Sequence, residues 1–267
     1  MRTTSTRDRR ASFGHRFFSA AVLSALILTL AAYRVQAAQV IAPDNGGGTA
    51  TMPPAGESYE SNLMQIINGL PVGTTVDIIS PLFGSFSTVS EVPGGVFAGG
   101  TTSSYDAQLV LPMVGTGTLA GYMRTINMPL LSASQLMDFD ARVPNTSPQS
   151  FDGDLRRMQG QIAGIGDPDF DLLRITAGGD FGMPSPGHTT LTDLGGGNWN
   201  VDSFFDITYR IDFVGHPGGP FSGMSGSTTL TSHFQMGMPV PEPASLSMLA
   251  SGLVGLGFVC WRRRRLG

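Results

Sequence analysis

The sequence predicts an all-β domain, an antiparallel β-sandwich of jelly-roll type with one short helix, set between two terminal segments that are not part of the fold. Three observations predict it: a long alternation of apolar and polar residues near position 205, several short apolar segments, and clusters of glycine and proline between them. Alternation with a period of two is typical of a half-buried strand, and many short strands separated by turns are typical of a sandwich.

The clearest strand runs from Phe204 to Val214, where large apolar side chains would share one face: Phe205, Ile207, Tyr209, Ile211 and Phe213. A weaker alternation runs from Thr228 to Met236 and directs His233 to the solvent face. The connecting residues 215–220 are rich in glycine and proline. We therefore expect the two strands to be antiparallel neighbours.

Further strands are expected at residues 75–80, 105–113, 119–130, 158–165 and 170–177. One short helix is predicted at Ser58–Asn68, because Leu63, Ile66 and Ile67 share a helical face and Gly69 suits a helix end. Residues 38–56 are rich in Gly, Pro and Thr and are expected to form a flexible lead-in, and residues 143–150 a surface loop. The β domain is therefore expected to span residues 57–237.

Residues 1–37 have the order of a signal peptide. Five arginines lie within the first 16 residues, an uncharged apolar stretch follows at 17–33, and small residues allow cleavage between Ala37 and Ala38. The alternative is an N-terminal membrane anchor. Arg9-Arg10 would fit twin-arginine export, but Phe13 lies one place too late for that motif. We expect export by the Sec translocase and removal of residues 1–37 by signal peptidase.

Residues 238–267 predict a membrane segment at the C-terminus. Ser245–Trp261 is uncharged over 17 residues, which span about 25 Å as a helix, the short end for crossing a bilayer core of about 30 Å. The arginines at 262–265 (Arg262, Arg263, Arg264 and Arg265) would stop translocation and remain in the cytoplasm. Upstream, Pro241 and Pro243 would keep Glu242 extended and accessible to an enzyme. An ordinary tail anchor in the inner membrane is the alternative.

Pro241-Glu242-Pro243, the apolar stretch and the terminal arginines together resemble the PEP-CTERM sorting signal of Gram-negative bacteria, over about a tenth of the chain. The resemblance implies that these three residues are recognised by an exosortase, a membrane cysteine protease or transpeptidase that holds the catalytic residues. It implies transient anchoring in the inner membrane, followed by display at the cell surface or release. Residues 169–175, 202–214 and 224–229 also resemble blocks of other exported proteins of this type, which have no assigned activity.

The charge of the exported part excludes some partners. Residues 38–239 contain six arginines and 18 acidic residues, a balance of −12, and the chain has no lysine. Such a surface repels nucleic acids and anionic lipids, so no nucleic-acid partner is expected. Residues 38–239 also contain no cysteine, which excludes disulfides and thiolate metal sites there.

No catalytic motif stands out, and we expect the protein not to be an enzyme. Gly223-Met224-Ser225-Gly226-Ser227 begins like a nucleophile elbow but ends in serine and precedes a strand. The histidines of the exported part, His188, His216 and His233, lack metal-ligand spacing. A pair of carboxylates that meet only in space could still hydrolyse a polysaccharide, and this hydrolase remains an alternative.

Asp167, Asp169 and Asp171 are candidate ligands for a structural Ca²⁺, the only cofactor that the sequence brings into question. On an extended segment their carboxylates share one face, and Ca²⁺ prefers several oxygen ligands. Asp152 and Asp154 are further candidates from another loop. The alternative is a solvated acidic loop helped by an arginine, namely Arg156, Arg157 or Arg174.

Trp199 is the candidate for glycan binding, with an exopolysaccharide as the partner. It lies in a glycine-rich segment, 195–200, beside two asparagines, where an exposed indole ring could stack on a sugar. The alternative is that Trp199 closes one end of the core. The sequence thus favours a noncatalytic exported protein of the cell surface or extracellular matrix. A glycan- or calcium-dependent binding module and a polysaccharide hydrolase are the two alternatives.

Overall fold

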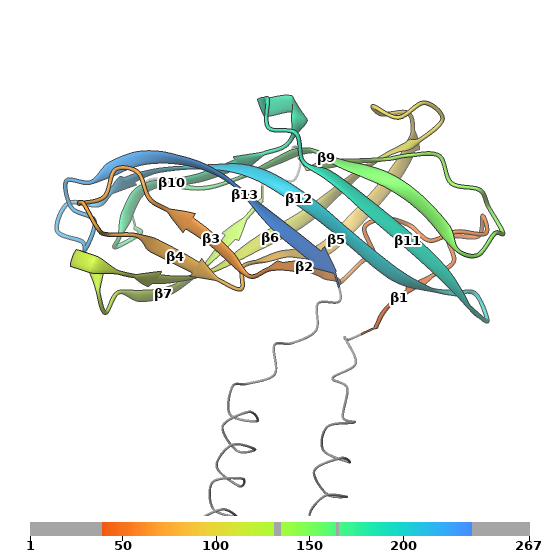
Figure 1. The fold of residues 1–267 in the computed structure, drawn as a ribbon, viewed down its shortest axis with the longest axis horizontal. Helices are drawn as coiled ribbons and strands as arrows, with labels where there is room; N and C mark the ends of the chain where they lie inside the picture. The colour runs from red at the N-terminus through yellow and green to blue at the C-terminus, as the bar shows by residue number, and fades with distance from the viewer. Residues whose placement is uncertain (1–38, 131–134, 164–165, 237–267) are drawn as a thin grey trace, which may run out of the picture. The chain divides into compact units, whose positions relative to one another are not determined.

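The computed structural model describes residues 39–130, 135–163 and 166–236 (Figure 1). They belong to one compact unit, Ala38–Met238, built almost entirely from antiparallel strands. The elements in chain order are β1 (Val40–Pro43), β2 (Ser58–Ser61), β3 (Leu63–Ile66), β4 (Val76–Ile79), β5 (Leu82–Pro93), β6 (Thr101–Gly115), η1 (Gly117–Leu119), β7 (Met123–Pro129), β8 (Leu136–Phe139), β9 (Gln149–Ala163), β10 (Phe170–Ala177), η3 (Gly179–Phe181), β11 (Pro186–Gly195), β12 (Asn198–Gly215) and β13 (Ser225–Met236).

The strand pairings form a closed circuit. From β9 they run through β11, β12, β13, β2, β5 and β6 to β8, which pairs with β9 again. Closure leaves no open edge along this circuit, and exposed edges are where sheets aggregate. The all-β, antiparallel prediction is confirmed. One closed sheet replaces the predicted two-sheet jelly-roll sandwich, because β8 joins the halves that would otherwise be separate.

Strand β12 follows the predicted alternation along its whole length. The five predicted inward residues, Phe205 to Phe213 at every second position, are at most 2% exposed. Its antiparallel pairing with β13 runs from Ser203–Met236 to Val214–Ser225, which confirms the predicted neighbours. His233 lies on the outer face, as predicted.

Aromatic side chains organise the core. Tyr59, Phe83, Phe86 and Tyr105 pack against one another, with ring centroids 5.2–6.2 Å apart, and Tyr59 also meets Phe205 edge-on. A second group consists of Tyr122, Phe170, Phe213 and Phe221, whose centroids lie 4.7–6.4 Å apart. Such pairs add to the stabilisation that burial of the rings already provides.

The predicted helix at Ser58–Asn68 is wrong. This segment forms β2 and β3, in which Tyr59, Met64 and Ile66 are buried. β2 pairs with β13 and β5, and β3 pairs with β4. These long-range pairings form the hydrogen bonds that the backbone N–H and C=O groups require, and they override a weak local helical pattern.

The expected flexible lead-in, residues 38–56, is also part of the fold where it is described. β1 pairs with the start of β12, and the side chains of Ala42, Ala50 and Met52 are buried. The domain therefore begins at β1 and not at residue 57.

Most of the other predicted strands are present. β4 and β9 overlap the segments predicted at 75–80 and 158–165, β6 covers the one at 105–113, and β10 has the predicted bounds. The segment predicted at 119–130 begins later, as β7, because residues 117–119 form η1 and a turn follows. Strands β5, β8 and β11 were not predicted. The predicted surface loop at 143–150 ends where β9 begins, at Gln149.

The terminal segments lie outside the described residues. The signal peptide with Ala37 and Ala38, the tripeptide 241–243, the membrane segment and the arginine cluster all fall there. In the part of the chain that the structure describes, no helix is both long enough and apolar enough to span a membrane.

Candidate functional site

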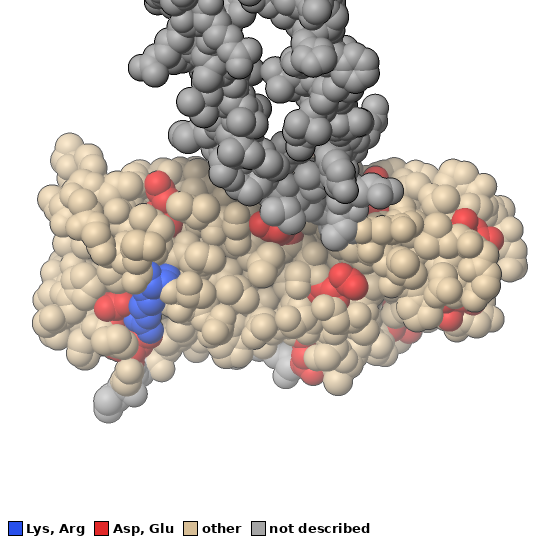
Figure 2. All heavy atoms as spheres, turned by 90° about the horizontal axis from the view of Figure 1, so that it is seen from below, with Lys and Arg blue, Asp and Glu red and all other residues tan. Residues whose placement is uncertain are grey.

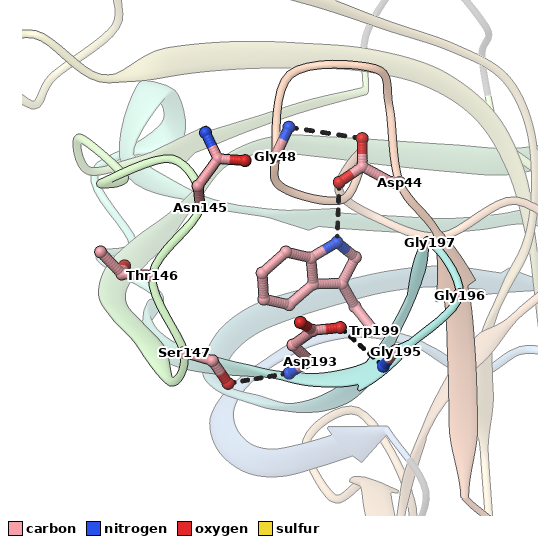
Figure 3. Close-up of a pocket in the computed structure, with 10 residues that line it drawn as sticks. All are labelled: Asp44, Gly48, Asn145, Thr146, Ser147, Asp193, Gly195, Gly196, Gly197 and Trp199. Atoms are coloured by element: carbon pink, nitrogen blue, oxygen red, sulfur yellow. Dashed lines mark hydrogen bonds between the residues drawn. The ribbon is translucent and has the colours of Figure 1, made fainter.

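A polar pocket with a volume of about 230 Å³ lies where the β11–β12 hairpin meets two loops (Figure 3). It is lined by the loop after β1 (Asp44 and Gly48), by residues 145–147 and by the hairpin residues 193–199 apart from Leu194 and Asn198. We call it the Trp199 pocket. The three segments are far apart in sequence, and antiparallel pairing of β1 with β12 helps bring them together.

Two runs of three glycines shape the rim of the Trp199 pocket. Residues 195–197 have φ values of +78°, +65° and +76°, a left-handed conformation that suits glycine. In each run a preceding aspartate accepts hydrogen bonds from the glycine backbone. Asp193 Oδ1 accepts from Gly195 N at 2.7 Å, and Asp44 Oδ1 accepts from Gly46 N at 2.7 Å. Both carboxylates are thereby fixed by local turns.

Trp199 is largely buried, with 4% of its surface exposed, so of the two interpretations that the sequence left open it is not the exposed stacking ring. It lies on the inward face of β12 and closes one end of the core, which was the alternative interpretation. Its Nε1–H donates to Asp44 Oδ2 at 3.1 Å. This hydrogen bond is the main reason that the pKa of Asp44 is lowered, so Asp44 is ionised at neutral pH. The ring supplies one wall of the pocket.

Three groups in the pocket keep free hydrogen-bonding capacity. The side-chain amide of Asn145 has no hydrogen-bond partner among the described residues. Ser147 Oγ accepts from Asp193 N at 3.0 Å, which leaves its own proton free to donate. Asp193 uses only Oδ1 in its bond to Gly195, so Oδ2 is available. The lining contains two carboxylates and no arginine.

Two of the three predicted calcium ligands, Asp167 and Asp169, share an arginine, and the third, Asp171, has a different partner. Asp167 and Asp169 both accept from Arg124, a partner on β7 that the sequence did not indicate. Tyr122 also donates to Asp169, at 2.9 Å. Asp171 accepts instead from His216 Nδ1, at 2.7 Å. Arg124 thus supplies the positive charge that the hypothesis assigned to calcium, and the described residues contain no group of three ligands suited to a metal.

The arginines expected to accompany the acidic loop, and Asp154, have other partners. Arg156 and Arg157 pair with Asp180, and Arg174 pairs with Asp212. Asp154 accepts from Ser185 N at 3.2 Å. Its pKa is raised, first by burial and then by the charges of Asp138 and Asp180.

Asp152 belongs to a hydrogen-bonded chain that the sequence did not reveal. It accepts from His188 Nδ1 at 2.7 Å, and His188 Nε2 lies 2.8 Å from Ser150 Oγ. Because an ionised carboxylate can only accept, Nδ1 carries the proton and Nε2 can accept from Ser150. This is the order of groups in a hydrolytic triad. It stands on the outer face of β9 and β11, where 68% of the Asp152 side chain and 39% of the His188 side chain are exposed.

Every arginine in the described part of the chain is paired with a carboxylate: Arg124, Arg142, Arg156, Arg157, Arg174 and Arg210. Acidic side chains are scattered over the face seen in Figure 2, and basic ones gather at one place beside acidic ones. The net negative charge of the domain is therefore carried by carboxylates that have no arginine partner.

Sequence reasoning missed Asp44, Asp193, Asn145 and Ser147. The available signal was the pair of glycine triplets, each closely preceded by an aspartate, at 44–48 and 193–197. Glycine triplets were interpreted only as turns. The two triplets come together because β1 pairs with β12. This pairing joins residues about 160 positions apart, and no local sequence pattern contains it.

No curated protein and no solved structure matches the chain. At the C-terminus, beyond the described residues, the chain carries the PEP-CTERM protein-sorting motif at residues 239–265, which implies an exported protein that an exosortase sorts to the cell surface.

Proposed function

We propose that this protein is a noncatalytic component of the cell surface or extracellular matrix. The Sec translocase exports it, signal peptidase removes residues 1–37, and the C-terminal segment holds it in the inner membrane until an exosortase cleaves near Pro241-Glu242-Pro243. The observation that carries the proposal is the PEP-CTERM sorting motif at 239–265.

The position of the domain's two ends supports this proposal. Val40 pairs with Val201, and Met236 pairs with Ser203, so the first and last strands lie end to end along the same edge of β12 (Figure 1). The leader and the tail are therefore joined to the domain at one place.

The chemistry of the described surface also fits an extracellular setting. The arginines are all neutralised by carboxylates, and the excess acidic residues keep the surface negative. Net charge of one sign favours solubility and disfavours association with nucleic acids. Residues 38–239 contain no cysteine, so their fold does not depend on disulfide formation after export and relies on the buried core.

A hydrolase is the competing function, and the chain Ser150–His188–Asp152 is the observation that favours it. Its exposure argues against it. Catalytic carboxylates and imidazoles act best in water-excluded sites, where preorganised donors stabilise the oxyanion. Asp152 and His188 are instead solvated on the outer face of a strand pair. We therefore favour the noncatalytic function.

Cell fractionation tests the sorting part of the proposal. In cells with an exosortase, the domain should leave the membrane fraction, whereas Glu242→Gln should remain in it. Asp202→Asn, which removes one exposed carboxylate from β12, is the matched control and should behave as the parent does. Deleting the exosortase gene should trap the parent in the membrane fraction. An identical distribution of the parent, Glu242→Gln and the deletion strain would refute exosortase-dependent sorting.

A further inference from the structure

The Trp199 pocket has the size of a site for one small polar molecule. Its volume of about 230 Å³ is below the roughly 300–1,000 Å³ of sites for drug-sized ligands. Such a space admits one sugar ring, and any sugars linked to it would lie outside the pocket in solvent. The pocket opens at the hairpin end of β11 and β12 and is formed by three separate segments, which hold its groups at fixed positions.

The groups in the Trp199 pocket match the two kinds of surface that a sugar presents. Trp199 is 4% exposed, and this small exposed part of the indole offers an apolar contact for a C–H group of a sugar ring. Asn145 offers an amide with both donors and an acceptor, Ser147 offers a hydroxyl proton, and Asp193 offers a free carboxylate oxygen. Together they can accept and donate hydrogen bonds to neighbouring hydroxyls.

The negative charge of the Trp199 pocket restricts which class of sugar it can bind. Asp44 and Asp193 both lie in the lining, and no arginine accompanies them. The hydrogen bonds that they accept come from neutral donors, a backbone amide and an indole, so their negative charge is not cancelled. A carboxylated sugar would be repelled, and a protonated amine would be attracted.

We infer that the Trp199 pocket binds one sugar residue that carries a free, protonated amine. The ammonium group pairs with Asp193 Oδ2, the ring hydroxyls bond to Asn145 and Ser147, and one edge of the sugar ring contacts the small exposed part of Trp199. A bare metal ion fits less well, because the pocket contains only two carboxylates and the described residues contain no group of three acidic, histidine or cysteine side chains that could hold one. This inference is independent of sorting, since binding can be measured on the purified chain.

A fluorescence titration of the full-length chain, purified in a detergent without a sugar headgroup, tests the inference. Trp261→Phe leaves Trp199 as the single tryptophan. Glucosamine, glucose and glucuronic acid are the probes, each titrated at pH 6.5. Glucosamine should give a saturable change and bind about tenfold more tightly than glucose, which corresponds to about 1.4 kcal/mol for one ion pair. Glucuronic acid should not bind, and 0.5 M NaCl should reduce the advantage of glucosamine.

Two variants locate the site. Asp193→Asn retains an oxygen for Gly195 N but removes the charge, and should lower the affinity for glucosamine to that for glucose. Asn145→Gly keeps the left-handed backbone at φ +60° and should lower the affinity for both glucosamine and glucose. Asp202→Asn should change neither. Saturation-transfer NMR on the sugar protons provides a readout that does not depend on the indole.

Three results would overturn the inference. The first is no saturable response to glucosamine by either method. The second is glucosamine binding that equals glucose binding or survives Asp193→Asn with its fold intact, as judged by circular dichroism. The third is a calcium response at the same site that glucosamine cannot compete with.

Discussion

Arg124 binds Asp167 through two parallel hydrogen bonds, from Nη1 to Oδ1 at 2.8 Å and from Nη2 to Oδ2 at 2.5 Å. The two residues join β7 to the segment before β10. The Asp167 side chain is 7% exposed, and its Oδ1 also accepts from the backbone amides of Asp169 and Phe170. These contacts stabilise the ionised form of the Asp167 carboxylate in the folded state. The stability of the domain should therefore depend on pH in a way that can be tested.

The Arg124 hydrogen bonds are the main cause that lowers the pKa of Asp167 below its ordinary value of 3.8. The unfolded chain therefore takes up this proton at a higher pH than the folded chain. The stabilisation is complete well above pH 3.8 and is lost as the pH falls through the lowered pKa of the folded state. Asp167→Asn should lower the free energy of unfolding by about 1–2 kcal/mol at pH 7, and the difference from the parent should shrink below pH 4.

Urea unfolding of the exported domain at several pH values measures this difference. Asp171→Asn is the control, because Asp171 is about half exposed and contacts His216 instead of an arginine. A difference between parent and Asp167→Asn that stayed constant from pH 7 to pH 3 would contradict the assignment.

The beginning of the domain offers a second prediction. Ala42 is buried on β1 opposite Trp199, while its neighbour Ile41 is half exposed. Ala42→Asp would bury an unpaired charge and should destabilise the domain by about 3 kcal/mol or more. Ile41→Asp places the same charge in solvent and should change stability by about 0.5 kcal/mol or less. Thermal and urea unfolding compare the two. Equal, small effects would mean that residues 40–43 are the flexible lead-in that the sequence predicted.

Two buried tyrosines give a third prediction. Tyr105 Oη has no hydrogen-bond partner among the described residues, whereas Tyr59 Oη lies 2.9 Å from Ser203 Oγ. Tyr105→Phe removes an unsatisfied polar atom and should leave stability unchanged or raise it by up to about 1 kcal/mol. Tyr59→Phe loses a hydrogen bond and should cost about 1 kcal/mol. The reverse order in chemical denaturation would show that Tyr105 has a partner in solution, such as a buried water.

Ser150 provides a direct test of the noncatalytic proposal. A fluorophosphonate probe labels serines whose hydroxyl is activated by a histidine in a working site. We expect no labelling of Ser150, because the chain Ser150–His188–Asp152 is open to solvent. The active control is a known serine hydrolase in the same mixture. Labelling that disappears in both Ser150→Ala and His188→Asn would make the protein a hydrolase.

The sequence predicted those parts of the fold in which one face of a strand is buried and the other is solvated. β12 is the best case, because its inward and outward residues alternate without interruption over 18 residues. Residues 58–68 show the opposite. Four-residue strands β2 and β3 are too short to display a period, and a change of partner occurs between them. Their apolar residues therefore matched a helical spacing by chance.

The candidate site was predicted only in part. The sequence left two interpretations of Trp199 open, an exposed stacking ring and a residue that closes one end of the core. Its burial opposite Ala42 on β1 agrees with the second, although the strand pairing that places it there is contained in no local pattern. Asp167 and Asp169 were correctly expected to need a cation between them. That Arg124 provides it depends on β7 lying beside the segment before β10, another contact between distant residues.

Mass spectrometry of the mature C-terminus tests the central claim most directly. The protein is recovered from cells with and without the exosortase, and its C-terminal peptide is identified. We predict a chain that ends close to Pro241-Glu242-Pro243 and lacks the arginines at 262–265 in cells with the enzyme, and an intact C-terminus in cells without it. An intact C-terminus ending in Gly267 in both strains would contradict sorting and processing by an exosortase.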